Sequence, residues 1–257
     1  MTDKKNIKPE KFEEIPEEDF EILLSRDNPR EEPQIYFADD LIAIYTAFRD
    51  QVYDPQSVLY PSSGFDASPV RVFDNVTFVD IEMGNDGCVR KLQEAGLHAL
   101  KQDIRNYIPE DLHDLLILLN PVIPTEWASR HLKSGGYVIA NNYHGNASEM
   151  YRQPDQFALW GVIDFAEQDR RKGDNRVVVS RDISDLFVPV ETGEELKRLR
   201  PIDYEFIATS YPHILRDIGI IPEMRFENMY VQFRRVMEES EILPAKRVAD
   251  RYIFVKK

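Results

Sequence analysis

The chain has 257 residues, of which 42% are hydrophobic, and its 46 acidic and 32 basic residues give a formal net charge of −14. This length fits one large domain, or one domain with additions. A surface this acidic repels phosphate backbones, so nucleic acid is not expected as the main partner. The single cysteine, Cys88, excludes an intrachain disulfide and suits a reducing compartment.

Two further classes of protein are excluded by the residue pattern. The first twenty residues have no apolar signal region, and no later stretch is long enough to cross a bilayer, so we expect a cytoplasmic protein without a membrane partner. Scattered histidines and one cysteine offer no metal-ligand spacing, so no metal site is predicted. Two small basic clusters, at 170–172 and 197–200, are interpreted as solvated helix faces or ends.

The N-terminal part of the chain is predicted to be an extension over residues 1–50, polar and flexible over residues 1–16. Over residues 39–53 apolar residues recur on one helical face, and Asp39 or Asp40 is the expected N-cap. We expect this helix to pack against the main sheet of an α/β domain over residues 51–257.

Strands alternate with helices in the first part of that domain. The sequence "DGCVRKLQEAG" is typical of a helix that stops at Gly96, and a second helix is predicted from Thr125 to the pair Gly135-Gly136. The alternation predicts a doubly wound, mostly parallel sheet of about seven strands, whose ligands bind outside the carboxyl ends of the strands. Five apolar runs are the expected strands: 57–60, 76–81, 97–104, 114–121 and 137–142.

The regular alternation fails over residues 149–206, which are interpreted as an insertion after the fifth strand. Within it "FALWGVIDFAEQ" is typical of a helix and "NRVVVSRD" of a strand. "YPHILRDIG" then resumes a helix that stops at Gly219, and "RYIFVKK" is a terminal strand. We expect the apolar residues of the insertion to form either a cover over the ligand pocket or a homodimer interface: Phe157, Leu159, Trp160, Val162 and Phe165.

The loop "YPSSGFD" between the first two strands has one glycine, Gly64, where the backbone can approach a ligand without an intervening Cβ. Ser62 and Ser63 are small and offer hydroxyls, although a plain strand-to-helix turn explains the same residues. Asp80 ends the next strand, and a carboxylate there can accept hydrogen bonds from both hydroxyls of a ribose. The alternatives are Glu82 in that role, or a solvated strand end.

Taken in order, these elements resemble the class I S-adenosylmethionine-dependent methyltransferases over residues 57–142 and 211–257. Gly64 matches the central glycine of the family's first motif, whereas Tyr60, Ser62 and Asp66 replace its acid and its other two glycines. The resemblance also implies that Asp103 accepts from the adenine amino group; a helix-capping role is the alternative. It implies these cofactor-binding residues: Tyr60, Pro61, Ser62, Ser63, Gly64, Asp66, Asp80, Ile81, Asp103, Ile104 and Asn120.

The same resemblance places the methyl acceptor near the ends of the fourth and fifth strands. "LLNPVIP" is similar to the Asn-Pro-Pro-aromatic motif of methyltransferases that modify amino nitrogens, but Val122 and Ile123 replace the second proline and the aromatic residue. "LKSGGYVIA" resembles the family's turn into strand five. The implied catalytic candidates are Asn120, Tyr143 and, as general base, His144; a strand-ending turn and a surface histidine are the alternatives.

The function implied by the resemblance is methyl transfer from S-adenosylmethionine to an unidentified small-molecule or protein acceptor. The departures at Tyr60, Ser62 and Asp66 leave a second hypothesis, an inactive cofactor-binding or scaffold protein on the same fold. An enzyme with a nicotinamide cofactor is a weaker alternative, because the loop lacks the G-x-G-x-x-G pattern. The acceptor and the oligomeric state are left open by the sequence.

Overall fold

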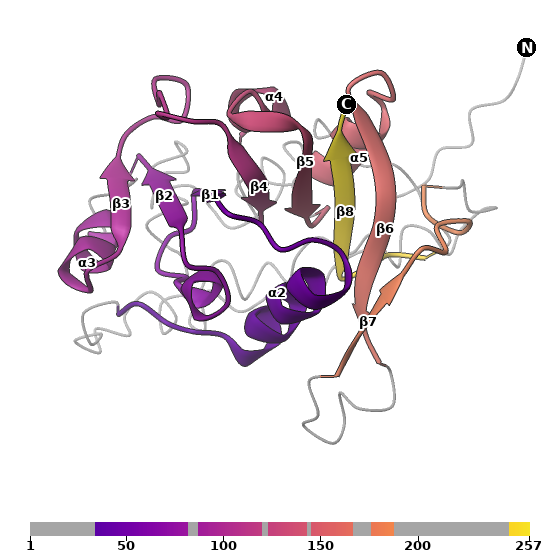
Figure 1. Ribbon diagram of the computed structural model, residues 1–257, viewed down its shortest axis with the longest axis horizontal. Coiled ribbons are helices and arrows are strands. Elements are labelled where there is room, and N and C mark those ends of the chain that lie inside the picture. Colours follow the sequence, from indigo (N-terminus) through magenta and orange to yellow (C-terminus); the bar gives the residue numbers. More distant parts are fainter. Residues whose placement is uncertain (1–33, 82–86, 120–122, 143–144, 167–175, 188–246) are drawn as a thin grey trace, which may run out of the picture. The chain divides into compact units, whose positions relative to one another are not determined.

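The computed structural model describes residues 34–81, 87–119, 123–142, 145–166, 176–187 and 247–257, all within one compact unit (Figure 1). The predictions for residues 1–16, for Glu82 and for the helix that stops at Gly219 lie outside these ranges.

One sheet organises the described residues, with the strand order β3-β2-β1-β4-β5-β8-β6-β7 (Figure 1). Strands β1 to β5 pair in parallel, β8 runs antiparallel between β5 and β6, and β7 is antiparallel to β6. The order β3-β2-β1-β4-β5 is that of a doubly wound fold, so the predicted α/β class is confirmed, with eight strands in this sheet instead of seven. The strands are β1 (Val58–Pro61), β2 (Val76–Asp80), β3 (His98–Lys101), β4 (His113–Leu118), β5 (Leu132–Ala140), β6 (Phe157–Phe165), β7 (Val177–Ser180) and β8 (Arg251–Lys256).

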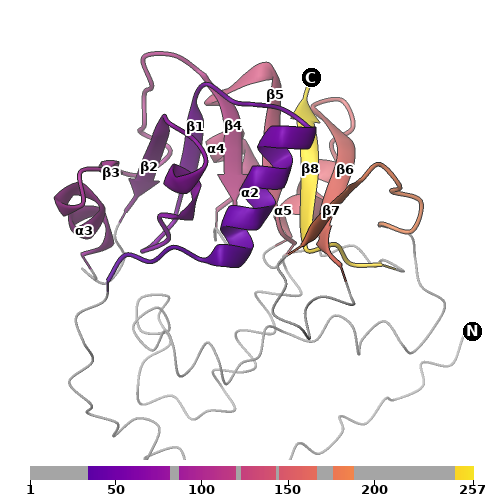
Figure 2. The same ribbon diagram turned by 60° about the horizontal axis from the view of Figure 1, so that its bottom comes forward.

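Two hydrophobic clusters lie on opposite faces of the sheet. Successive side chains of a strand point to opposite faces, so in β4 Leu115 and Ile117 join the first cluster while Leu116 and Leu118 join the second. Helices α2 (Asp39–Gln51) and α3 (Cys88–Glu94) cover the first cluster, and α4 (Thr125–Ser129) and α5 (Asn146–Tyr151) cover the second. Figure 2 shows α2 in front of the sheet.

Helix α2 confirms the predicted helical spacing, since Leu41, Tyr45 and Phe48 are buried on one face. The predicted N-cap is wrong: Ala38 precedes the helix, and both aspartates lie in its first turn. Negative charge in the first turn still favours the helix, because the unpaired amides there carry partial positive charge. The start of α2 is tied to the loop after β1, where the Ala38 amide donates to Ser68 Oγ over 2.9 Å.

Residues 157–165 form strand β6, so the helix predicted for this stretch is wrong. The strand is paired on both sides, with β8 and with β7, and its residues serve both faces of the sheet. The apolar residues expected to form a cover or an interface lie in this strand: Phe157 and Val162 are buried in the second cluster, and Leu159, Trp160 and Phe165 are partly buried against the two clusters.

The second predicted helix is shorter than expected, because α4 ends at Ser129 and the Gly135-Gly136 pair lies inside β5. The register between β4 and β5 shifts at this point, from His113–Leu132 to Leu115–Tyr137. A Cβ on Gly136 would lie 2.8 Å from the Leu132 side chain and 3.0 Å from the Asp114 carbonyl oxygen. The glycines therefore accommodate an irregularity of the strand pair instead of ending a helix.

None of the helices in the described part of the chain combines the length and the apolar character that crossing a bilayer requires.

Candidate functional site

The predicted cofactor residues of the described ranges lie at or after the carboxyl ends of β1, β2 and β3 along the chain. The strand order reverses at β1, which pairs with β2 on one side and with β4 on the other. The loop that follows β1 and the acid that ends β2 therefore lie beside the switch point of the sheet, the position where doubly wound folds bind their ligands.

Two residues of the loop after β1 have a left-handed backbone conformation. Ser62 has φ of 54° and Gly64 has φ of 56°, a region that is costly for a serine and free for a glycine. The Ser62 amide donates to the Val79 carbonyl oxygen over 3.0 Å, which continues the pairing of β1 with β2. Apart from its chain neighbours, no heavy atom of the described residues lies within 4 Å of the position that a Cβ on Gly64 would take. The backbone is thus open at Gly64, as a close ligand approach requires.

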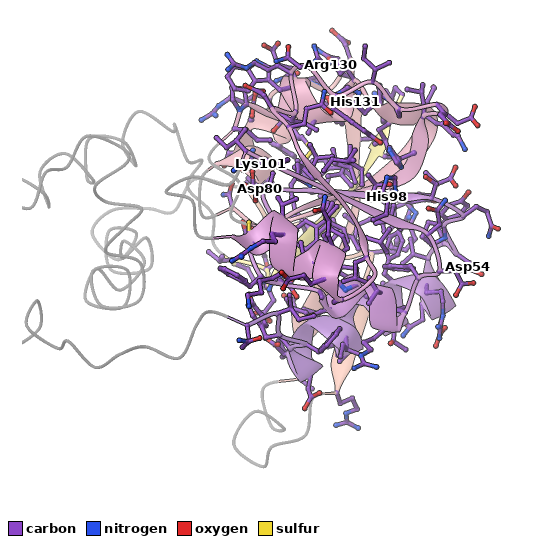
Figure 3. The ribbon with its side chains drawn as sticks, turned by 90° about the vertical axis from the view of Figure 1, so that its left-hand side faces the viewer. Asp54, Asp80, His98, Lys101, Arg130 and His131 are labelled. Atoms are coloured by element: carbon purple, nitrogen blue, oxygen red, sulfur yellow. The ribbon has the colours of Figure 1, made fainter. Side chains whose placement is uncertain are left out.

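Asp80 brings a carboxylate to this loop from the end of β2. Its Oδ2 accepts a hydrogen bond from the Gly64 amide at 3.4 Å, and its carbonyl oxygen accepts from Gln102 at 2.9 Å. Lys101 is its register partner on β3, and Figure 3 shows the two side chains close together. Ile81, the next residue, is 49% exposed. The edge therefore presents an acid, a base and an accessible apolar side chain.

Tyr60 and Asp66 have turned inward from this edge and are 3% and 1% exposed. The Tyr60 hydroxyl donates to Asp66 Oδ2 at 3.0 Å, and Asp66 Oδ1 accepts from the Ser68 amide at 2.8 Å and from its hydroxyl. Burial is the main cause that raises the pKa of Asp66, and it also raises the pKa of Tyr60 well above its ordinary value. These two side chains join the two ends of the loop. Pro61 and Ser63 are buried as well.

Asp103 and Ile104 follow β3, but both have protein partners. The Asp103 carboxylate accepts from the Arg105 amide at 2.8 Å and pairs with its guanidinium at 2.5 Å. Hydrogen bonds from Arg105 are the main cause that lowers the pKa of Asp103. Arg105 also lies over the Trp127 ring of α4, 4.7 Å from its centroid. Ile104 is buried in the second cluster.

The three candidate catalytic residues, Asn120, Tyr143 and His144, lie outside the described residues. They stay predictions, and chain order places them after β4 and after β5.

Two side chains that the sequence analysis missed link the segments after β4 and after β5. Asn146 Nδ2 donates to the Ile123 carbonyl oxygen at 3.0 Å and to Thr125 Oγ1 at 3.2 Å. Glu149 Oε2 accepts from the Thr125 amide at 2.9 Å. The available signal was the start of α5, where polar residues follow Gly145, which has φ of 79°.

Within the described ranges, no group of three or more His, Cys, Asp or Glu residues is placed to hold a metal ion. No family model matches the sequence, and no curated protein matches it.

The solved structures that this chain resembles include S-adenosylmethionine-dependent methyltransferases. The N-methyltransferase NodS from Bradyrhizobium japonicum, solved with S-adenosyl-L-homocysteine, is 13% identical; the match covers 58% of this chain and 90% of NodS, with a TM-score of 0.39. The amino pentose methyltransferase CalS10 from Micromonospora echinaspora, solved with S-adenosylmethionine, is 15% identical over 43% of this chain and 58% of CalS10, with a TM-score of 0.33.

The sugar N-methyltransferase KedS8 from Streptoalloteichus is 13% identical over 55% of this chain and 58% of KedS8, with a TM-score of 0.33. The chain thus spans 58% of the length of CalS10 and of KedS8.

Proposed function

We propose that this chain binds S-adenosylmethionine at the carboxyl edge of β1 and β2 and transfers its methyl group to a small-molecule or protein acceptor. The observation that carries the proposal is the meeting of the Gly64 amide with the Asp80 carboxylate, 3.4 Å apart beside the switch point of the sheet. Two features that bind a nucleoside are present there: a backbone that the ligand can approach closely, and an acceptor for the ribose hydroxyls.

The residues of the edge fit such a cofactor. Asp80 would accept from the ribose hydroxyls, the open side of Gly64 would let the ligand lie against the loop backbone, and Ile81 would offer an apolar surface. The sulfonium supplies a methyl group that is already activated. The protein therefore contributes mainly by holding donor and acceptor in line, and Asn120, Tyr143 and His144 are proposed to face the acceptor.

Calorimetry with S-adenosyl-L-homocysteine tests the proposal. Replacing Asp80 by alanine should weaken binding by about 1.5–3 kcal/mol, because a hydrogen bond to a charged group is lost. Asp54→Ala is the matched control: Asp54 is an exposed acid that lies away from Asp80 (Figure 3), and its loss should leave the affinity unchanged. Equal affinities for wild type and Asp80→Ala would remove Asp80 from the site. An absence of heat from all three proteins would contradict the proposal.

The second candidate is a cofactor-binding protein without transferase activity, favoured by the inward-turned Tyr60 and Asp66. This candidate predicts that the protein binds S-adenosyl-L-homocysteine as tightly as the first candidate does. It also predicts that S-adenosylmethionine is not converted when cell extract supplies the acceptors. A cytoplasmic location, a homodimer and the domain limits 1–50 and 51–257, with an insertion at 149–206, are further proposals that accompany both candidates.

A further inference from the structure

A polar cluster lies at the opposite edge of the sheet, where the parallel strands begin. His98 starts β3, His113 starts β4 and His131 directly precedes β5. Tyr107 comes from the segment between β3 and β4, and Ser57 directly precedes β1. Figure 3 shows His98 apart from Asp80 and Lys101, and His131 beside Arg130. The methyl-transfer proposal assigns these residues no part.

His113 is the centre of the cluster and is 4% exposed. Its Nδ1 lies 2.6 Å from Ser57 Oγ, and its Nε2 lies 2.9 Å from the Tyr107 hydroxyl. The imidazole is also stacked against the Tyr107 ring, with centroids 6.0 Å apart and an interplanar angle of 23°. Both ring nitrogens and one ring face are therefore occupied by groups of the protein.

His131 contacts the segment that carries Tyr107 at Ile104, three residues earlier in the chain. It is 5% exposed, and its Nε2 lies 3.0 Å from the Ile104 carbonyl oxygen and 3.2 Å from Arg130 Nε. Arg130 donates to this carbonyl oxygen at 3.2 Å and also to that of Arg105. The His131 ring meets the Tyr107 ring edge to face, with centroids 5.1 Å apart.

These contacts supply much of what fastens residues 103–112 to the sheet. Within this segment only Ile104 and Tyr107 are buried, and Ile108 is 88% exposed. The buried hydroxyl of Tyr107 and the carbonyl oxygen of Ile104 are the groups that His113 and His131 contact. Asp103, the predicted adenine partner, stands at the start of the same segment.

We propose that His113 and His131 are positioning residues of the cofactor site: as neutral imidazoles they hold residues 103–107, and with them Asp103, against the sheet. The inference rests on the proposed function, and it takes Asp103, which the resemblance predicts to contact adenine, as an additional residue of that cofactor site. It assigns the histidine cluster a role at a site on the opposite edge, transmitted through one short segment.

The charges around the imidazoles oppose their protonation. His98, His131 and Lys133 face His113 from neighbouring elements, and Asp114 is the group that favours a charge there, although Lys133 pairs with it at 2.7 Å. Burial is the main cause that lowers the pKa of His113 to about 4. Burial is again the main cause that lowers the pKa of His131; the hydrogen bond with the Ile104 carbonyl oxygen raises this pKa, and the charges of Arg130 and Lys256 lower it.

The direction of the pH effect follows mainly from the burial of the two imidazoles. The attached segment keeps both histidines neutral, whereas a released segment lets them reach water and titrate near their ordinary value. The released state therefore binds more protons below pH 6.5, about the ordinary pKa of histidine, and acid favours release.

Hydrogen exchange and calorimetry at pH 7.5 and pH 5 test the inference, with exchange rates corrected for the intrinsic effect of pH. In the wild type, peptides covering residues 103–107 should lose protection at pH 5 while β4 keeps it. The affinity for S-adenosyl-L-homocysteine should fall by at most about thirtyfold, the factor by which pH 5 favours release when the pKa of His113 returns from about 4 to 6.5. Equal protection of residues 103–107 at both pH values would overturn the inference.

His113→Gln keeps a polar group near Tyr107 but cannot take up a charge, so both pH effects should shrink. His98→Gln, at an exposed histidine of the same edge, is the control: His98 is the smallest of the causes that act on the pKa of His113, so this change should alter the pH profile much less than His113→Gln does. If His113→Gln retains the wild-type pH effect on exchange, the inference is wrong, whether or not the ligand binds. Absence of ligand heat at pH 7.5, with the exchange effect present, would contradict the cofactor proposal alone.

Tyr107→Phe provides a second variant in case His113→Gln does not fold. It keeps the ring and removes the hydroxyl that His113 Nε2 contacts. Residues 103–107 should then exchange faster at pH 7.5, and the ligand affinity should fall. Exchange equal to that of the wild type would overturn the inference.

Discussion

Asp66 stands where the resembling family has a glycine, and its environment explains how an acid is tolerated there. A buried carboxylate is costly unless hydrogen bonds replace its hydration. Asp66 accepts three hydrogen bonds, one from the Tyr60 hydroxyl and two from Ser68. Two departures from the family motif, Tyr60 and Asp66, are thus partners of each other. The sequence shows both residues but carries no signal that they meet beneath α2.

Tyr60→Phe tests this partnership. The change leaves Asp66 Oδ2 without its hydroxyl donor in a buried site, which should lower the free energy of unfolding by about 1–3 kcal/mol. Urea denaturation measures the effect. Tyr151→Phe is the control, because Tyr151 is 42% exposed and its hydroxyl can be hydrated. Equal stability of Tyr60→Phe and Tyr151→Phe would show that the buried hydrogen bond contributes little.

His113 gives a second prediction at the scale of a single residue. Its folded pKa of about 4 lies below the ordinary value near 6.5, so the unfolded chain binds more protons between these two values. The stability contributed by neutral His113 is present above pH 6.5 and is lost as the pH falls toward 4. The loss should reach about 2 kcal/mol at pH 5.

Urea denaturation of the wild type and of His113→Gln, each at pH 7 and pH 5, measures that loss. The difference between the two pH values should be smaller in the variant by the contribution of His113. A variant with the full wild-type difference would assign the acid sensitivity to other groups, such as His131, whose pKa is lowered in the same direction.

Strand β6 shows where prediction from sequence fails at the scale of elements. Its apolar residues occupy neighbouring positions, and a short apolar run does not separate a buried strand from a buried helix. Residues 157–165 form a strand because they pair with β8, which lies near the C-terminus; Leu159 of β6, for example, is paired with Phe254 of β8. By contrast, β1, β2 and β4 were predicted because turn residues bound each of their apolar runs.

Gly161→Ala tests how tightly β6 is fitted between its neighbours. A Cβ at this position would lie 2.4 Å from the Ser180 carbonyl oxygen, so the backbone of β7 would have to move. We expect a loss of about 1–3 kcal/mol in the free energy of unfolding, as for other overpacked sites.

Gly96→Ala is the comparison for that change. Within the described ranges, no heavy atom other than those of its chain neighbours lies within 4 Å of the Cβ position at Gly96, and the φ of 78° adds only the local strain of a left-handed residue, about 1–2 kcal/mol. Urea denaturation measures the two losses of stability. Hydrogen exchange should also show weaker protection of β7 in Gly161→Ala than in Gly96→Ala. Wild-type exchange throughout β7 in that variant would contradict the predicted displacement.

At the scale of the whole molecule, the fold class was predictable, and so was the meeting of Gly64 with Asp80 at one edge of the sheet, whereas the contacts of the neighbouring side chains were not. The alternation of strands and helices determines a parallel sheet, and a parallel sheet places Gly64 and Asp80 at one edge. Which side chains face that edge depends on packing between distant elements. The Asp103 carboxylate is thus paired with Arg105, and Ile104 is buried in the second cluster.

The net charge of −14 is the property of the whole molecule that bears most directly on its partner. Several basic side chains of the described residues pair with acids of the chain, among them Arg105 with Asp103, Lys133 with Asp114 and Arg247 with Asp164. Affinity for a phosphate backbone comes mostly from cations that release counterions, and the long-range field of this acidic protein repels a phosphate backbone.

We therefore expect no tight complex with mixed DNA or RNA in a mobility-shift assay at low salt. A basic peptide with the same probes is the positive control. A sub-micromolar complex that weakens with added salt would contradict this expectation, and would direct attention to the basic clusters at 170–172 and 197–200.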